Sequence, residues 1–213
     1  MVFDLDGVLV DTSEVHAQAY AEVWRRAGLV GPSYADIAGR RTEEVVREVL
    51  ADSTEQERAI WVEFKQTRAR QLLETAPVRF AGALRVLSEL AATNVPLGLA
   101  TGASRLNVEL LLARQGLARF FKSVVTADEV TRGKPHPMPF EQVTRELGVA
   151  VEQTLVVEDS GAGMRAAVAA GAAVVCVHTG LAITHPRFCG SFGTLDAVGG
   201  WILERLAGSE PEG

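Results

Sequence analysis

Two different patterns of hydrophobic and polar positions divide the chain. Between residues 12 and 75 the apolar side chains recur at three- and four-residue intervals, as in amphipathic helices, and no stretch has the pattern of a strand. They fall into three groups: Val15, Ala19 and Val23; Val45, Val46, Val49 and Leu50; Ile60, Phe64 and Leu72. Gly28 can end the first helix, and Thr54 with Glu57 forms a capping box before the third. This block is predicted to be a small helical bundle.

From residue 77 onward, helical segments alternate with short apolar runs. The predicted helices cover residues 82–92, 104–115, 139–147 and 162–170, and the predicted strands cover 95–100, 123–126, 154–157 and 172–177. Strands separated by single helices predict a parallel sheet with right-handed crossovers. The apolar run 2–5 adds a first strand. We therefore expect an α/β fold: a doubly wound, Rossmann-like core of residues 1–11 and 76–213, with an α-helical domain of residues 12–75 inserted after the first strand.

Composition narrows the class of partner. The chain has 213 residues, of which 47% are hydrophobic, and a formal net charge of −6. This charge argues against a nucleic-acid or anionic-membrane surface, although a few well-placed Lys and Arg residues could still bind phosphate, so an anionic substrate is not excluded. Cys176 lies in an apolar run and is expected to be a buried thiol, which suits a reducing cytoplasm. We expect no signal peptide and no membrane span, a cytoplasmic location, and a monomer.

Polar side chains collect where the predicted strands end. Asp4 and Asp6 end the first strand, where period-two alternation would place them on one face, beside a Gly turn suited to a divalent cation. Thr101 ends another strand, residues 131–136 carry Lys134, and the 154–157 strand runs into Glu158 and Asp159. Each has an ordinary alternative: surface carboxylates, a helix cap, a solvated lysine. Because the carboxyl ends of parallel strands share one edge, convergence on a site is the favoured interpretation.

Four segments carry a resemblance to a known family. They are FDLDGVLVDT (3–12), ATG (100–102), GKPHP (133–137) and VEDSGAG (157–163). In this order and spacing they resemble the haloacid dehalogenase superfamily, in the branch with a helical cap that contains β-phosphoglucomutase and sugar- and polyol-phosphate phosphatases. The resemblance implies that residues 12–75 form the cap domain, which closes over the substrate and reads the leaving group.

The resemblance implies a nucleophile and a metal. Asp4 would attack phosphorus and form an aspartyl-phosphate. Mg²⁺ would offset the repulsion between carboxylate and phosphate, held by the Asp4 side chain, the Asp6 carbonyl and Asp159, with Glu158 in or next to the ligand shell.

It also implies groups that act on the phosphoryl oxygens and on the leaving group. Lys134 would pair with Asp4 and the transferring oxygens, and Thr101 and the backbone near Gly102 and Ala103 would hydrogen-bond them. Asp6 would protonate the leaving alkoxide and later deprotonate the attacking water. Dehalogenases of the superfamily lack an acid there, so Asp6 favours phosphate esters over carbon–halogen chemistry.

The cap contributes further candidates. His16 stands where mutase relatives carry a histidine implicated in gating the acid/base residue. Arg40 and Arg41 lie in a loop that resembles the specificity loop, and Lys65 and Arg68 share one side of the third cap helix and could reach a sugar hydroxyl or a second phosphate. The alternative for each is a packed or solvated side chain.

Two departures from the mutase pattern affect the predicted function. The mutase-like arginine of the cap loop falls on Thr42, and residues 103–105 lack the Lys-Asn pair of the mutase. A mutase needs a second phosphate clamp to hold a bisphosphate intermediate. We therefore predict a Mg²⁺-dependent phosphatase for a small phosphorylated sugar or polyol. The alternatives are a β-phosphoglucomutase-like sugar phosphomutase and a non-catalytic ligand-binding protein on the same scaffold.

Overall fold

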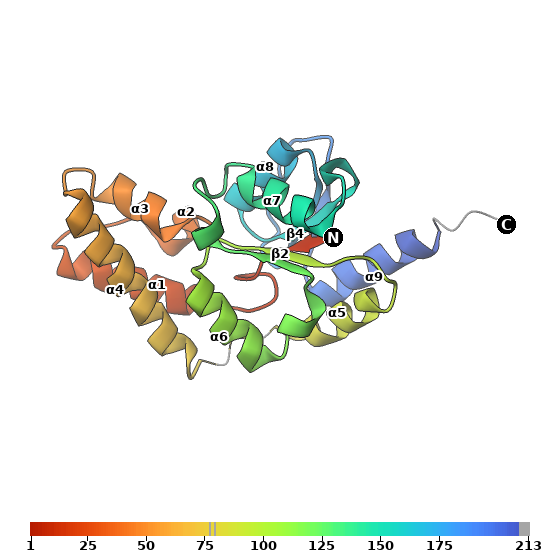
Figure 1. Ribbon diagram of the computed structural model, residues 1–213, viewed down its shortest axis with the longest axis horizontal. Helices are drawn as coiled ribbons and strands as arrows, with labels where there is room; N and C mark the ends of the chain where they lie inside the picture. Colours follow the sequence, from red (N-terminus) through yellow and green to blue (C-terminus); the bar gives the residue numbers. More distant parts are fainter. Residues whose placement is uncertain (77, 79, 209–213) are drawn as a thin grey trace.

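In the computed structural model, which describes residues 1–76, 78 and 80–208, six parallel strands form one sheet in the order β3-β2-β1-β4-β5-β6 (Figure 1). The strands are β1 (Val2–Phe3), β2 (Gly98–Ala100), β3 (Ser123–Val125), β4 (Leu155–Glu158), β5 (Ala173–Val177) and β6 (Phe188–Phe192). The order reverses between β1 and β4, which lie side by side at the centre of the sheet. This confirms the doubly wound α/β fold.

Helices cover both faces of the sheet. The α-helices are α1 (Ser13–Arg26), α2 (Tyr34–Ile37), α3 (Thr42–Val49), α4 (Glu55–Leu73), α5 (Ala83–Ala91), α6 (Arg105–Gln115), α7 (Met138–Leu147), α8 (Gly161–Ala170) and α9 (Leu195–Ala207). Short 3-10 turns are η1 (Ala118–Phe120), η2 (Ala127–Glu129) and η3 (Val151–Gln153). In Figure 1, α7 and α8 lie on one side of the sheet and α5, α6 and α9 on the other.

Alternation along each strand explains why both faces are covered. One face contributes Phe3, Leu99, Val157 and Val175 to the core shared with α5, α6 and α9; the other contributes Val2, Ala100, Val156 and Val174 to the core shared with α7 and α8. All of these side chains are fully buried. A parallel strand that is buried on both faces reads as a continuous apolar run, as these do.

The helices between β1 and α5 form a group at one end of the sheet (Figure 1). We call residues 12–75 the helical insertion. It has its own apolar cluster around Tyr20, Trp24 and Val45, and α4 packs against both α1 and α3. The predicted capping box of Thr54 and Glu57 is present at the start of α4. α4 also contacts α6, so the insertion packs against the core.

Three details differ from the sequence-based expectations. β1 ends at Phe3, so Asp4 directly follows the strand, and Asp6, which pairs with Val10 across the turn at Gly7, lies outside it; the two carboxylates are not on one strand face. Ile60 is 63% exposed, and the buried face of α4 is formed by Lys65, Ala69 and Leu73. β6 and α9 were not predicted. The predicted core boundary at residue 213 lies outside the described residues.

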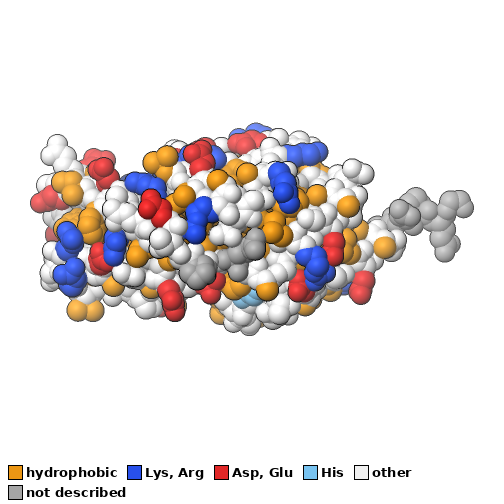
Figure 2. Space-filling model, turned by 90° about the horizontal axis from the view of Figure 1, so that it is seen from below, with side chains coloured by type: hydrophobic (Ala, Val, Ile, Leu, Met, Phe, Trp, Pro, Cys, Tyr) orange, Lys and Arg blue, Asp and Glu red, His pale blue; other side chains and the backbone are white. Residues whose placement is uncertain are grey.

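The surface and the thiols agree with the composition. On the face shown in Figure 2, acidic and basic side chains are interspersed with hydrophobic ones. Cys176 is a buried free thiol, as predicted. Within the described ranges, none of the helices combines the length and apolar character that crossing a membrane requires.

Candidate active site

The polar strand ends converge where the strand order reverses. Asp4 directly follows β1, and Glu158 is the last residue of the neighbouring β4. In open α/β sheets, this crevice at the carboxyl ends of the strands is the usual ligand site. The fold therefore brings together groups that are 154 residues apart in the chain.

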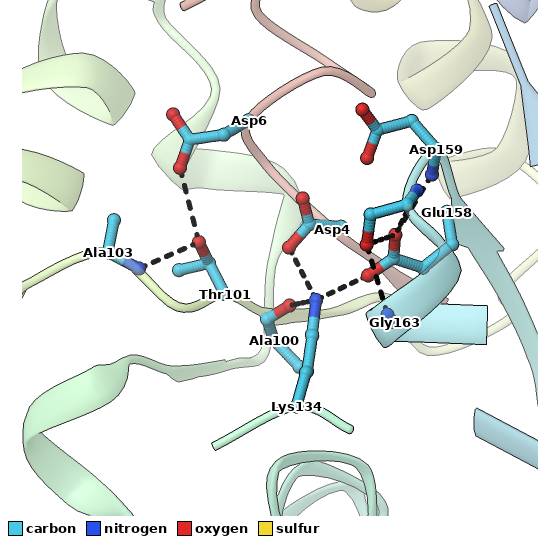
Figure 3. A network of polar contacts seen from close by, with 10 residues as sticks. Asp4, Asp6, Ala100, Thr101, Ala103, Lys134, Glu158, Asp159 and Gly163 are labelled. Carbon is cyan, nitrogen blue, oxygen red and sulfur yellow. Dashed lines mark hydrogen bonds and ion pairs between the residues drawn. The ribbon is translucent and has the colours of Figure 1, made fainter. Parts of the chain in front are cut away.

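Lys134 joins the two acidic strand ends (Figure 3). Its Nζ donates to Asp4 Oδ1 at 2.6 Å, to Glu158 Oε1 at 2.5 Å and to the Ala100 carbonyl at 2.9 Å. All three side chains are buried. Burial by itself lowers the pKa of Lys134, but the two carboxylates outweigh it and raise the pKa above its usual value. Lys134 therefore stays a cation at the centre of the site.

Asp4, Glu158 and Asp159 form an acidic cluster. Each offers a carboxylate oxygen, and these oxygens lie within 4.8 Å of one another. Burial, and then repulsion from Glu158 and Asp6, raises the pKa of Asp4 to about 8, although Lys134 opposes this. Burial, Glu158 and Asp4 raise the pKa of Asp159 to about 9. A largely buried set of carboxylate oxygens, whose negative charge one lysine compensates only in part, fits a hard divalent cation such as Mg²⁺.

Glu158 has hydrogen-bond partners on both carboxylate oxygens. Oε1 accepts from Lys134, and Oε2 accepts from the backbone N–H groups of Asp159 at 2.9 Å and Ser160 at 3.0 Å, and from the Ser160 hydroxyl at 3.0 Å. Ser160 is also the N-cap of α8, accepting from the Gly163 N–H. These contacts favour a position for Glu158 next to the ligand shell, with Asp4 and Asp159 supplying the open carboxylate oxygens.

Asp6 is surrounded by hydrogen-bond donors. Oδ1 accepts from the Thr12 hydroxyl at 2.5 Å and lies 3.2 Å from His16 Nε2, and Oδ2 accepts from the Thr101 hydroxyl at 3.3 Å. Burial raises the pKa of Asp6, but the contacts with His16 and Thr12 outweigh it and bring the pKa to about 2. The Ala103 N–H donates to the Thr101 hydroxyl at 3.2 Å, which fixes its orientation.

His16 connects Asp6 to Lys65. Its Nδ1 lies 3.2 Å from Lys65 Nζ. Burial and the nearby Lys65 lower the pKa of His16, and burial lowers the pKa of Lys65 to about 8, although Asp6 and Glu43 oppose this. A neutral imidazole that accepts at Nδ1 and donates from Nε2 satisfies both contacts.

A cavity of about 30 Å³ lies between the insertion and the core. Its predicted lining residues are Asp4, Asp6, His16, Arg40, Lys65, Thr101, Gly102 and Ala103. Tyr20, Tyr34 and Ile37 also line it and were not predicted, because nothing in their spacing separates them from the cap core. This volume holds one or two water molecules, which is less than a sugar phosphate needs.

Two predicted cap residues point elsewhere. Arg41 does not line this cavity: its Nη1 donates to the Thr131 carbonyl at 3.1 Å and lies 3.8 Å from Glu44 Oε1. Arg68 donates from Nε to Glu22 at 2.9 Å, within the insertion. The structure therefore gives no support to a substrate contact by either arginine.

Comparisons with known proteins identify the family of the chain. The family described as haloacid dehalogenase-like hydrolase matches residues 1–177. The chain is 32% identical over 188 residues to a validoxylamine A 7'-phosphate phosphatase of Streptomyces hygroscopicus subsp. limoneus, covering 86% of this chain and 85% of that protein. It is also 32% identical over 181 residues to hexitol phosphatase A of Escherichia coli K12, covering 83% and 82%.

A solved structure of a β-phosphoglucomutase from Clostridium difficile superposes with a TM-score of 0.84 over 97% of this chain and 96% of that one. At 22% identity this similarity shows the fold, including the helical cap, and nothing about the substrate. The residues matched by the family include both halves of the sheet and the whole insertion. The chain therefore belongs to the helical-cap branch of the haloacid dehalogenase-like hydrolases, and within it to the phosphatases.

Proposed function

We propose that the protein is a Mg²⁺-dependent phosphatase that hydrolyses a small phosphorylated sugar or polyol through an aspartyl-phosphate. The observation that carries this proposal is the pair Asp4 and Asp6. Both line the same cavity, but Asp4 is held by the cation Lys134, whereas Asp6 is held by neutral donors. Two carboxylates in different environments suit two different roles, nucleophile and acid/base.

In the first step, Asp4 attacks the phosphorus of the ester. Lys134 engages Oδ1, so we assign Oδ2 as the attacking atom. An Oδ2–P bond forms, the bond from phosphorus to the alcohol oxygen breaks, and Asp6 gives its proton to that oxygen. Lys134 stabilises the charge on the phosphoryl oxygens, and Thr101 orients Asp6.

In the second step, water replaces Asp4. Asp6, now ionised, takes the proton from the water, a new oxygen–phosphorus bond forms, and the bond from Asp4 to phosphorus breaks. The contacts that lower the pKa of Asp6 keep its carboxylate ionised for this step. A phosphate dianion beside Asp6 raises the pKa of its carboxyl by like-charge repulsion, which favours the protonated form that the first step needs.

The residues that would hold the metal are Asp4 and Asp159, with the Asp6 carbonyl completing the set and Glu158 beside it. When bound, Mg²⁺ offsets the negative charge of these carboxylates and of the phosphate, which keeps Asp4 ionised at neutral pH. Asp4, which is buried, and Asp159, which is half-buried, supply the carboxylate oxygens that this charge requires.

The substrate class rests on the relatives and on the cap side of the cavity. The two relatives above are named validoxylamine A 7'-phosphate phosphatase and hexitol phosphatase A. Tyr20, Tyr34 and Ile37 from the insertion give the leaving group apolar and aromatic surface, and Arg40 and Lys65 give it donors. A small polyhydroxy alcohol fits this combination of surfaces.

The test is phosphate release from a panel of sugar, polyol and glycolate phosphates, with Mg²⁺ and with a chelator, using Asp4→Asn as the blank. We expect metal-dependent release that is lost in the variant. Interconversion of a sugar 1-phosphate and its 6-phosphate without release would assign the protein to the mutases. Binding of esters without either reaction would overturn the catalytic proposal.

A further inference from the structure

Arg41, which does not line the cavity, takes part in a different contact between the insertion and the core. Glu44 Oε1, in the first turn of α3, accepts a hydrogen bond from the backbone N–H of Gly133 at 2.6 Å. Arg41, which precedes α3, donates to the carbonyl of Thr131 at 3.1 Å. Both bonds cross about 90 residues of sequence to the loop that carries Lys134. We call these two contacts the latch.

The latch is closely packed. Gly133 is buried, and a Cβ at this position would collide with the Arg41 side chain and lie 3.2 Å from Glu44 Oε2. The Arg41 and Glu44 side chains are only 14% and 23% exposed. A hydrogen bond from a backbone N–H to a carboxylate, partly shielded from water, is among the stronger ones in proteins. The close approach of the insertion at this point therefore depends on a residue without a side chain.

The latch holds the backbone immediately before Lys134. On the inner side of the loop, Lys134 Nζ is fixed by Asp4, Glu158 and the Ala100 carbonyl. On the outer side, the only side chains described as bonding to the backbone of residues 131–133 are Arg41 and Glu44. If the insertion moves away to admit substrate, the loop keeps its inner contacts and loses its outer ones.

We propose that Arg41 and Glu44 are positioning residues: with the insertion closed, the latch fixes the loop at residues 131–133 and thereby sets the position of Lys134 against the phosphoryl group. Closure over a substrate then completes the catalytic arrangement as well as excluding water. The contact itself stands on geometry alone, while its effect on turnover rests on the proposed function.

The first test does not need a substrate. The exchange rate of the Gly133 amide is measured by NMR in the wild type, in Glu44→Ala and in Glu44→Gln. Loss of the carboxylate is expected to speed exchange at least about tenfold, and the Gln variant, which keeps an acceptor oxygen, should lie between the two. Glu48→Ala is the matched control, because Glu48 lies one turn along α3, is 66% exposed and contacts Arg40. It should leave Gly133 exchange unchanged.

Equal exchange rates in the wild type and Glu44→Ala would overturn the latch. If Glu44→Ala does not fold, Arg41→Ala tests the latch by the same exchange measurement. This variant removes the hydrogen bond to the Thr131 carbonyl and the side chain that lies next to Glu44.

The second test measures turnover on several esters. Because Lys134 acts on the phosphoryl group, which all esters share, Glu44→Ala should lower kcat by a similar factor, about tenfold, for every ester, with most activity restored in Glu44→Gln. If Glu44→Ala changed the order of preferred esters, its effect would lie in the substrate cavity and not at Lys134. If Glu44→Ala exchanged the Gly133 amide faster but kept kcat unchanged, the latch would not determine the position of Lys134. If the wild type releases no phosphate, the proposed function fails while the exchange test still decides the latch.

Discussion

The ammonium group of Lys65 lies 3.2 Å from Nδ1 of His16, although 49 residues separate them in the chain. Nε2 of the same ring lies 3.2 Å from Asp6, so a residue of α4 reaches the acid/base candidate through one imidazole. Lys65 also lies over the Tyr20 ring, 4.4 Å from its centroid. Its charge is thus buried against an imidazole and an aromatic ring, without a carboxylate in direct contact among the described residues.

Replacing Lys65 by Met should stabilise the fold and lower activity. Burial lowers the pKa of Lys65 from 10.5 to about 8, so between these values the unfolded chain holds more protons and stability rises with pH. Below pH 8 the cost of the buried charge is fully present, and its removal should raise the free energy of unfolding by roughly 1–3 kcal/mol. The gain should shrink as pH rises towards 10.5.

Urea unfolding of the wild type and of Lys65→Met, near neutral pH and between pH 8 and 10.5, measures this difference in the free energy of unfolding. Lys122→Met is the control, because Lys122 is exposed, and it should change stability little. A lower stability of Lys65→Met near neutral pH would contradict the prediction. The same variant should lose phosphatase activity, because His16 would lose the donor at Nδ1 that fixes its tautomer.

Replacing Asp6 by Asn should lower kcat by about 10²–10⁴-fold, the usual contribution of a positioned acid or base. Asn keeps acceptor and size but can neither protonate the leaving alcohol oxygen nor take the proton from water, so both steps should slow. The phosphorylated form of Asp4 accumulates where the second step is slowed more than the first. Intact-protein mass spectrometry after mixing with substrate would detect the added phosphoryl group. Asp11→Asn, an exposed carboxylate of the same segment, should behave as wild type. Undiminished turnover in Asp6→Asn would exclude Asp6 as the acid/base.

The sheet and its polar edge could be predicted because both depend on local signals. The buried parallel strands read as apolar runs, and β1, β2 and β4 each run directly into the polar residues of one motif. The strand order alone therefore brings Asp4, Thr101 and Glu158 to one edge of the sheet, and predicting this requires no knowledge of side-chain packing. β6 was missed because Phe188–Phe192 is only half buried and contains Gly190, so it lacks that apolar signal.

The cap side of the site could not be predicted in the same way. Arg40 and Arg41 are adjacent, yet one lines the cavity and the other binds the loop at Thr131, because the extended backbone at Arg41 sends the two side chains in different directions. Similarly, spacing alone favours Ile60 as a buried residue of α4, whereas Lys65 is buried because its helix face meets α1 at His16. Such differences arise from the way the insertion docks, which no local pattern encodes.

Mg²⁺ should stabilise the protein, and Asp159→Asn should abolish the effect. A ligand that binds only the folded state at about 100 times its Kd adds about 2.7 kcal/mol to the free energy of unfolding. Thermal unfolding with Mg²⁺ and with a chelator measures this as a shift in Tm. Asp52→Asn, an exposed carboxylate of the insertion, should keep the full shift. An equal shift in Asp159→Asn would remove Asp159 from the metal site.

Gly7 and Gly116 provide a matched pair of substitutions that separates backbone strain from damage to the site. Both have positive φ, +82° and +68°, so Ala at either position costs about 1–2 kcal/mol in conformational energy. Nothing lies within 4 Å of a Cβ at Gly116, whereas a Cβ at Gly7 would collide with the carboxylate of Asp159. Gly116→Ala should therefore lower Tm slightly and keep both the Mg²⁺-dependent shift and the activity.

Gly7→Ala should lower Tm further and should lose both the Mg²⁺-dependent shift and the activity, because the Asp159 carboxylate must move out of the acidic cluster to make room for the added Cβ. Thermal unfolding with and without Mg²⁺, together with phosphate release, compares the two variants on the same measurements. A Mg²⁺-dependent shift in Gly7→Ala as large as that of Gly116→Ala would mean that the position of the Asp159 carboxylate beside Gly7 is not the one that binds the metal.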